Sequence, residues 1–133
     1  MLKVEHIGIA VQSLQKSIPL FEALLNTSCY KQEQVDSEAV RTAFFRKGET
    51  KVELLEPTNP ESVIARFLEK KGEGMHHIAF DVADIHAEMA RLAAAGFTLL
   101  NPEPKKGADN KLVCFLHPKD TSGVLIELCQ EIF

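Results

Sequence analysis

The sequence lacks the features that mark several large classes of protein. It has no tryptophan, one tyrosine and three cysteines among 133 residues. It contains no apolar run of about twenty residues, which a membrane-spanning helix needs. It also lacks a basic segment followed by an apolar one, which a secretory leader needs. We therefore expect no membrane association, and a location in the cytoplasm or, after removal of a leader, in the mitochondrial matrix.

Positive charge is also scarce. Fifteen Lys and Arg residues stand against 19 Asp and Glu residues, so the formal net charge is −4 with histidines neutral. Proteins that bind nucleic acid or anionic membranes usually carry a clustered excess of Lys and Arg. The densest such cluster here is only Lys70 and Lys71. The sequence therefore predicts neither a nucleic-acid partner nor a membrane partner.

The cysteines do not indicate a disulfide framework or a thiolate metal site. Cys29, Cys114 and Cys129 are odd in number and have no C-x-x-C spacing, so we expect reduced structural thiols. A chain of this length buries enough surface to fold without disulfides or a structural metal. We therefore expect one domain spanning residues 1–133.

An internal repeat organises the chain. Residues 5–14 align without a gap with residues 76–85, and each copy contains His-Ile, a small residue, an apolar residue and a later Val. A helical pattern follows each copy, with apolar residues at 14, 18, 21 and 25 and again at 85, 89, 92 and 93. Pro19 removes a helical hydrogen bond, so the first helix is expected to begin irregularly or near Ser17.

Three strand candidates follow each helix, which gives the order βαβββ twice. They are residues 27–32, 40–46 and 51–56, then 98–100, 112–117 and 124–129. A short helix is expected at about 60–71. Each half has too few strands to bury its sheet alone. We therefore predict an α+β fold in which tandem modules, about 1–57 and about 74–131, form one curved mixed sheet around a metal site.

Four ligand-type residues occupy equivalent positions of this repeat. Strand alternation places His6 and His77 on a face where the residue two positions on is small. Glu53 and Glu127 each lie between apolar neighbours in the last strand of their module, where a carboxylate needs a positive partner. The four predict a His-Glu-His-Glu site for Co²⁺, Mn²⁺, Fe²⁺, Ni²⁺ or Zn²⁺.

The alternative for each residue alone is structural. A strand histidine is commonly a satisfied core residue, and a strand glutamate commonly faces solvent or pairs with Lys or Arg. The coincidence of four at equivalent positions favours the metal site. His76 has the opposite parity, so we expect it to pack or to lie at an edge.

The duplicated modules with ligands on their first and last strands resemble the vicinal oxygen chelate superfamily over nearly the whole chain. Six segments further resemble the methylmalonyl-CoA epimerase family, at residues 40–44, 51–57, 64–70, 72–80, 115–119 and 123–128. The resemblance implies metal ligands at His6, Glu53, His77 and Glu127. It implies an isomerase that interconverts (2R)- and (2S)-methylmalonyl-CoA by metal-assisted 1,1-proton transfer through an enolate, and a homodimer.

The same resemblance guides the choice of acid and base. Glu127 is the expected base, through an oxygen not held by the metal, with Glu53 or a loop acid opposite it. Some family members have a Glu at the position of Thr42, and a threonine cannot replace a carboxylate base. Asp36 and Glu38 are the loop alternatives.

The CoA phosphates need cationic partners in an epimerase of this kind. The candidates are lysines in loops beside a second-half strand, although an exposed lysine is by default a solvated surface residue. They are Lys105, Lys106, Lys111 and Lys119.

Three other functions are compatible with parts of this pattern. A glyoxalase-type lyase or isomerase acting on a glutathione hemithioacetal uses the same chelation and carboxylate chemistry. An extradiol dioxygenase needs only two His and one carboxylate, so Glu53 and the short chain disfavour it. A non-enzymatic small-molecule-binding protein of the same fold needs no metal set.

Overall fold

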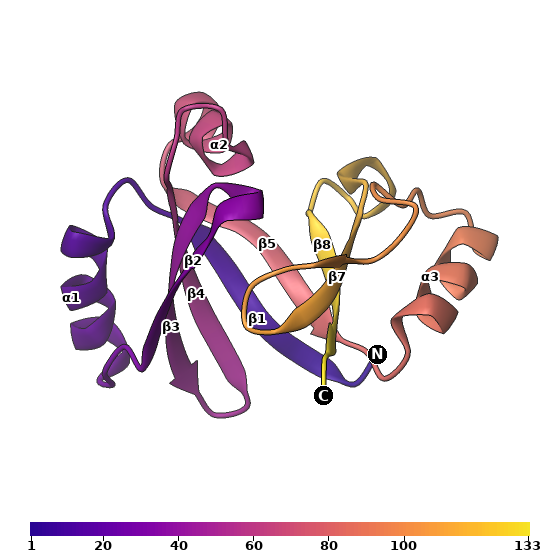
Figure 1. Ribbon diagram of the computed structural model, residues 1–133, viewed down its shortest axis with the longest axis horizontal. Coiled ribbons are helices and arrows are strands. Elements are labelled where there is room, and N and C mark those ends of the chain that lie inside the picture. Colours follow the sequence, from indigo (N-terminus) through magenta and orange to yellow (C-terminus); the bar gives the residue numbers. More distant parts are fainter. The chain divides into compact units, whose positions relative to one another are not determined.

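The computed structural model describes residues 1–133 (Figure 1). The chain divides into two compact units, residues 6–76 and residues 77–133 with 1–5. Each unit contains a strand, a helix and three further strands, so the predicted α+β fold with a repeated βαβββ order is confirmed. None of the three α-helices combines the length and hydropathy that crossing a bilayer requires.

The elements of the first unit are β1 Lys3–Ala10, α1 Leu14–Leu25, β2 Lys31–Val35, η1 Asp36–Glu38, β3 Val40–Lys47, β4 Thr50–Pro57 and α2 Val63–Lys71. Those of the second are β5 Gly74–Asp81, α3 Ile85–Ala94, β6 Lys105–Lys106, β7 Lys111–Leu116, η2 Pro118–Asp120 and β8 Ile126–Glu131. The unit boundary cuts two strands. The start of β1, up to residue 5, belongs to the second unit, and the start of β5, up to residue 76, belongs to the first.

The two units share strand order and register. Counted from the first strand of each unit, the orders are β1-β4-β3-β2 and β5-β8-β7-β6. In each, the first strand pairs in parallel with the last, and the remaining pairs are antiparallel, so the sheets are mixed. Gly8 pairs with Glu53, and Ala79 pairs with Glu127. The sequence repeat is therefore also a repeat of hydrogen-bonding register.

Each sheet has a helix against one face (Figure 1). Partly buried residues of α1 pack against Phe45 and Leu54, and α3 packs against Cys114 and Leu128. The other face of the first sheet carries Ala10 and Leu55, which α2 covers with Ile64 and Leu68. Because side chains alternate along a strand, this second face also carries His6 and Glu53.

The first helix begins earlier than the alternative start near Ser17. Two backbone amides of its first turn have side-chain acceptors. The Ser13 hydroxyl accepts from the Lys16 amide at 3.3 Å, and the Glu56 carboxylate accepts from the Leu14 amide at 3.0 Å. Pro19 lies inside the helix without ending it. The Asp84 side chain caps α3 by accepting from the Ala87 amide, and Gly96 has a positive φ of 99° just past the helix.

Two strand predictions are wrong. The second strand begins at Lys31, and just before it the Tyr30 amide donates to the Phe44 carbonyl of β3. Residues 98–100 form a single bridge, and β6 lies at Lys105–Lys106 instead. Between them the Asn101 side chain bonds the backbone of β7 in place of a neighbouring strand.

Ala39 is strained between η1 and β3. Its φ is 53° and its ψ is 48°, a left-handed conformation in which the Cβ of an L-residue clashes with the following carbonyl. Replacing Ala39 by glycine should raise the free energy of unfolding by about 0.5 to 1 kcal/mol, and the thermal midpoint by about 2 to 4 °C. Calorimetry measures this.

The control is Ala90→Gly on the exposed side of α3. That position lies inside a helix, where glycine is less favourable than alanine. Ala90→Gly should therefore lower the free energy of unfolding by about 1 kcal/mol. A thermal midpoint lowered by Ala39→Gly as well would contradict the assigned strain.

Candidate functional site

The first unit brings His6 and Glu53 together. Both are about 5% exposed, and His6 Nε2 lies 3.9 Å from Glu53 Oε2. They come from the neighbouring parallel strands β1 and β4, and Gly8 is the residue paired with Glu53. The small residue two positions after His6 therefore lies directly across from Glu53.

The second unit repeats this arrangement with His77 and Glu127. They are 4% and 5% exposed, and His77 Nε2 lies 3.3 Å from Glu127 Oε1. Ala79 takes the place of Gly8 in the pairing. The Phe115 ring meets the His77 ring edge to face, with centroids 5.9 Å apart, which restricts the imidazole.

The repeat extends to the residues on the other side of each carboxylate. Phe44 pairs with Glu53, and Phe115 pairs with Glu127. A lysine ammonium lies over each ring, Lys31 at 5.4 Å from the Phe44 centroid and Lys105 at 5.8 Å from that of Phe115. Each unit therefore presents an imidazole, a carboxylate, an aromatic ring and a cation.

Both His-Glu pairs have the spacing of two ligands on one metal ion. Two ligand atoms about 2.1 Å from an ion lie about 3.0 Å apart at right angles and about 4.2 Å apart when opposite. The observed 3.3 and 3.9 Å fall within this range. Imidazole nitrogen with carboxylate oxygen suits borderline divalent cations. Each pair therefore fits half of a divalent metal site.

The predicted loop alternatives for a second base lie in the turn η1. Asp36 is exposed and accepts a hydrogen bond from the Gln34 side chain at 2.8 Å, and it shares the turn η1 with Glu38. Thr42 is fully buried, and because it pairs with Leu55 it shares the face of Glu53. Its hydroxyl donates to the Glu33 carbonyl at 3.2 Å. It serves as a packed strand residue.

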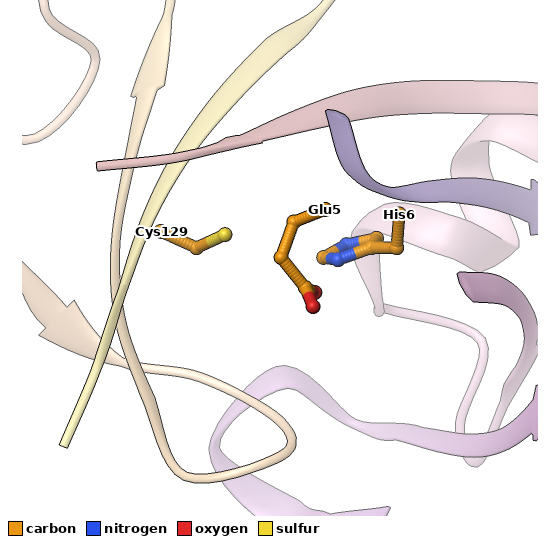
Figure 2. A group of neighbouring side chains, drawn as sticks. All are labelled: Glu5, His6 and Cys129. Carbon is orange, nitrogen blue, oxygen red and sulfur yellow. The ribbon is translucent and has the colours of Figure 1, made fainter. Parts of the chain in front are cut away.

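Sequence reasoning missed a buried polar cluster in the second unit. Glu5 and Lys111 are 4% and 6% exposed, with Lys111 Nζ 4.0 Å from Glu5 Oε2. Figure 2 draws Glu5 with the buried Cys129 and with His6, the next residue in the chain. Burial, together with the charges of Glu127 and Glu5, raises the pKa of the Cys129 thiol, which is therefore neutral.

Lys111 is therefore not the exposed loop lysine that was predicted to meet CoA phosphates. It begins β7 as a buried residue, held also 4.0 Å from Glu131. Lys105 and Lys106 form β6, and Lys119 lies in η2. No pattern in the sequence distinguishes Lys111 from the exposed lysines, because its burial depends on Glu5 at the other end of the chain.

Replacing Lys111 by methionine should lower the free energy of unfolding by about 3 kcal/mol, because it removes a cation beside the buried Glu5 carboxylate. Adding Glu5→Gln should recover part of this loss. Urea denaturation of the single and double variants measures both effects. The exposed Lys106→Met is the control and should change stability by less than about 0.5 kcal/mol. Strictly additive losses would contradict the coupling.

Comparison with known proteins finds similarity over most of the chain. Residues 5–115 match the Glyoxalase/Bleomycin resistance protein/Dioxygenase superfamily. An ethylmalonyl-CoA/methylmalonyl-CoA epimerase of Cereibacter sphaeroides is 40% identical over 130 residues, 96% of this chain and 97% of that protein. The mitochondrial methylmalonyl-CoA epimerase of Homo sapiens is 40% identical over 129 residues, 96% of this chain and 73% of that protein.

A solved structure is similar throughout. It is a variant of the methylmalonyl-CoA epimerase of Streptomyces coelicolor in complex with 2-nitronate-propionyl-CoA. It has a TM-score of 0.92 and 34% identity, and the match covers 98% of this chain and 95% of that one. The likeness therefore extends over the elements that carry both His-Glu pairs.

Proposed function

Because this chain belongs to the Glyoxalase/Bleomycin resistance protein/Dioxygenase superfamily and is an isomerase of the methylmalonyl-CoA epimerase kind, we propose that it interconverts (2R)- and (2S)-methylmalonyl-CoA. The observation that carries the proposal is the pair of buried His-Glu sets at the same register in both units. The proposed substrate is an acyl-CoA, in keeping with the acyl-CoA analogue named with the Streptomyces coelicolor structure.

The proposal assigns His6, Glu53, His77 and Glu127 to one divalent cation, which is Co, Mn, Ni, Fe or Zn. Such a cation, when bound, would act as a Lewis acid and stabilise negative charge on the thioester oxygen by several kcal/mol. Imidazole and carboxylate donors, the spacing within each pair and the burial of all four residues support this assignment. That the four meet on one ion stays a prediction.

The proposed proton transfer uses one carboxylate from each unit. Glu127 takes the α-proton, so that the C–H bond breaks, an O–H bond forms on Glu127, and the electron pair moves to the thioester carbonyl. Glu53, protonated beforehand, returns a proton to the opposite face of the resulting enolate. Burial of both carboxylates excludes water that would otherwise weaken their electrostatic effects.

The test is proton NMR of methylmalonyl-CoA in D₂O with the metal-loaded protein. The α-proton signal should disappear at a rate proportional to protein concentration, because each turnover exchanges the proton with solvent. Absence of protein-dependent exchange would defeat the epimerase proposal. Turnover of a glutathione hemithioacetal in its place would establish the glyoxalase-type alternative.

Two accompanying predictions are not tested by the structure. The expected homodimer rests on the family and on exposed sheet edges, and sedimentation at micromolar concentration tests it. The expected cytoplasmic or mitochondrial matrix location is consistent with the mitochondrial name of the human relative. Fractionation of the source cells tests this location.

A further inference from the structure

A groove lies beside α2 in the first unit, away from the His-Glu pair. Its volume is about 510 Å³, and its lining combines apolar, aromatic and cationic side chains. The lining residues are Val63, Arg66, Phe67, Glu69, Lys70, Lys71 and His76. Three cations against one carboxylate give it a local charge of opposite sign to the net −4 of the chain.

The groove has an aromatic wall. The Phe67 and His76 rings meet edge to face with centroids 5.0 Å apart, and the Lys71 ammonium lies 5.9 Å from the Phe67 centroid. His76 therefore packs, as its strand parity predicted. Exposed Val63 continues the apolar surface at the start of α2. A planar ring seated on this wall would place its attached groups among the cations.

A structural role at the end of α2 accounts for two of the three cations. Lys70 and Lys71 lie in the last turn of α2, where positive charge complements the helix dipole. That role does not account for Arg66, one turn earlier, or for the aromatic wall. Arg66 donates to the Glu61 carbonyl at 2.9 Å, so its guanidinium is held at the groove without being neutralised by a carboxylate.

We propose that this groove binds the adenosine 3′,5′-bisphosphate end of the CoA thioester, with the adenine on the Phe67 and His76 wall and the phosphates on Arg66, Lys70 and Lys71. This inference deepens the proposed function and rests on it. The occupant follows from charge and shape, because that end of CoA is a planar ring carrying several phosphates. The position also fits, because α2 packs over the sheet face that carries His6 and Glu53.

The direct test is calorimetric binding of adenosine 3′,5′-bisphosphate to the full chain, without turnover. The double variant Arg66→Ala, Lys70→Ala should raise the dissociation constant about tenfold or more, because it removes two charged contacts to phosphate. The control Lys16→Ala, Lys47→Ala removes the same charge from exposed positions elsewhere. It should leave the dissociation constant within about twofold.

Steady-state kinetics gives a second readout. The groove variant should raise KM for methylmalonyl-CoA about tenfold and leave kcat unchanged, because the proposed contacts are to the nucleotide and not to the reacting carbon. Its KM for methylmalonyl-pantetheine, which lacks the nucleotide, should not change. Equal effects of the groove and control variants, or of the variant on both substrates, would overturn the proposal.

The two proposals fail differently. If the chain binds adenosine 3′,5′-bisphosphate in the groove but does not exchange the α-proton, the epimerase proposal fails and the groove assignment stands. If exchange occurs while groove and control variants bind the bisphosphate equally well, only the groove assignment fails.

Discussion

Replacing Glu127 by glutamine should lower the rate of α-proton exchange by about 10³-fold, because an amide cannot accept the proton. General base catalysis contributes about 10² to 10⁴ in rate, and a thousandfold loss corresponds to about 4 kcal/mol in the activation barrier. Glutamine keeps the size of the buried side chain and one oxygen donor toward a metal. The loss should therefore appear in kcat, with metal binding retained.

The measurement uses each epimer of methylmalonyl-CoA separately in D₂O. Two bases on opposite faces serve different epimers, so Glu127→Gln should stop exchange from one epimer more severely than from the other. Glu53→Gln should show the reverse preference. This contrast separates loss of a base from general damage to the site, which would slow exchange from both epimers alike.

A matched control lies on the same strand. Glu131 is also in β8, but it is 60% exposed and lies 4.0 Å from Lys111, so Glu131→Gln should leave the exchange rate within about twofold. Activity retained in a metal-loaded Glu127→Gln variant would remove Glu127 from the role of base. Calorimetric titration of metal into both variants provides the necessary check of binding.

Much of this arrangement is predictable from the sequence because the repeat carries it. His6 with Gly8 and His77 with Ala79 define the parity of the two first strands, and the repeat predicts that each histidine shares a face with the glutamate of its own module. The structure adds the register, in which Glu53 and Glu127 each lie across from the small residue. Alternation within each strand is local and can be read from a single sequence, whereas the strand pairing and its register come from the structure.

Features that depend on distant partners were not predictable. Lys111 is buried because Glu5, more than a hundred residues earlier, supplies the opposite charge. The last strand candidate before β7 failed because the Asn101 side chain takes over backbone hydrogen bonds that a strand would make. The start of α1 depends on Glu56 in β4, whose carboxylate accepts from the Leu14 amide. In each case the deciding contact is tertiary.

Removing divalent metal with a chelator should also abolish exchange, and adding the metal back should restore it. Metal binding should stabilise the fold as well, since a ligand at a hundred times its dissociation constant adds about 2.7 kcal/mol to the free energy of unfolding. For a chain of this size the thermal midpoint should rise by roughly 8 to 10 °C. Differential scanning calorimetry with and without Mn²⁺ or Co²⁺ measures this.

Histidine variants then decide whether the two pairs share one ion. If His6, Glu53, His77 and Glu127 bind a single cation, His6→Gln and His77→Gln should each remove most of the metal-induced stabilisation, and elemental analysis of the wild type should find one ion per chain. If each pair holds its own ion, each variant should lose only about half of the metal-induced stabilisation, and the wild type should hold two ions per chain. The exposed His86→Gln in α3 should behave as the wild type does.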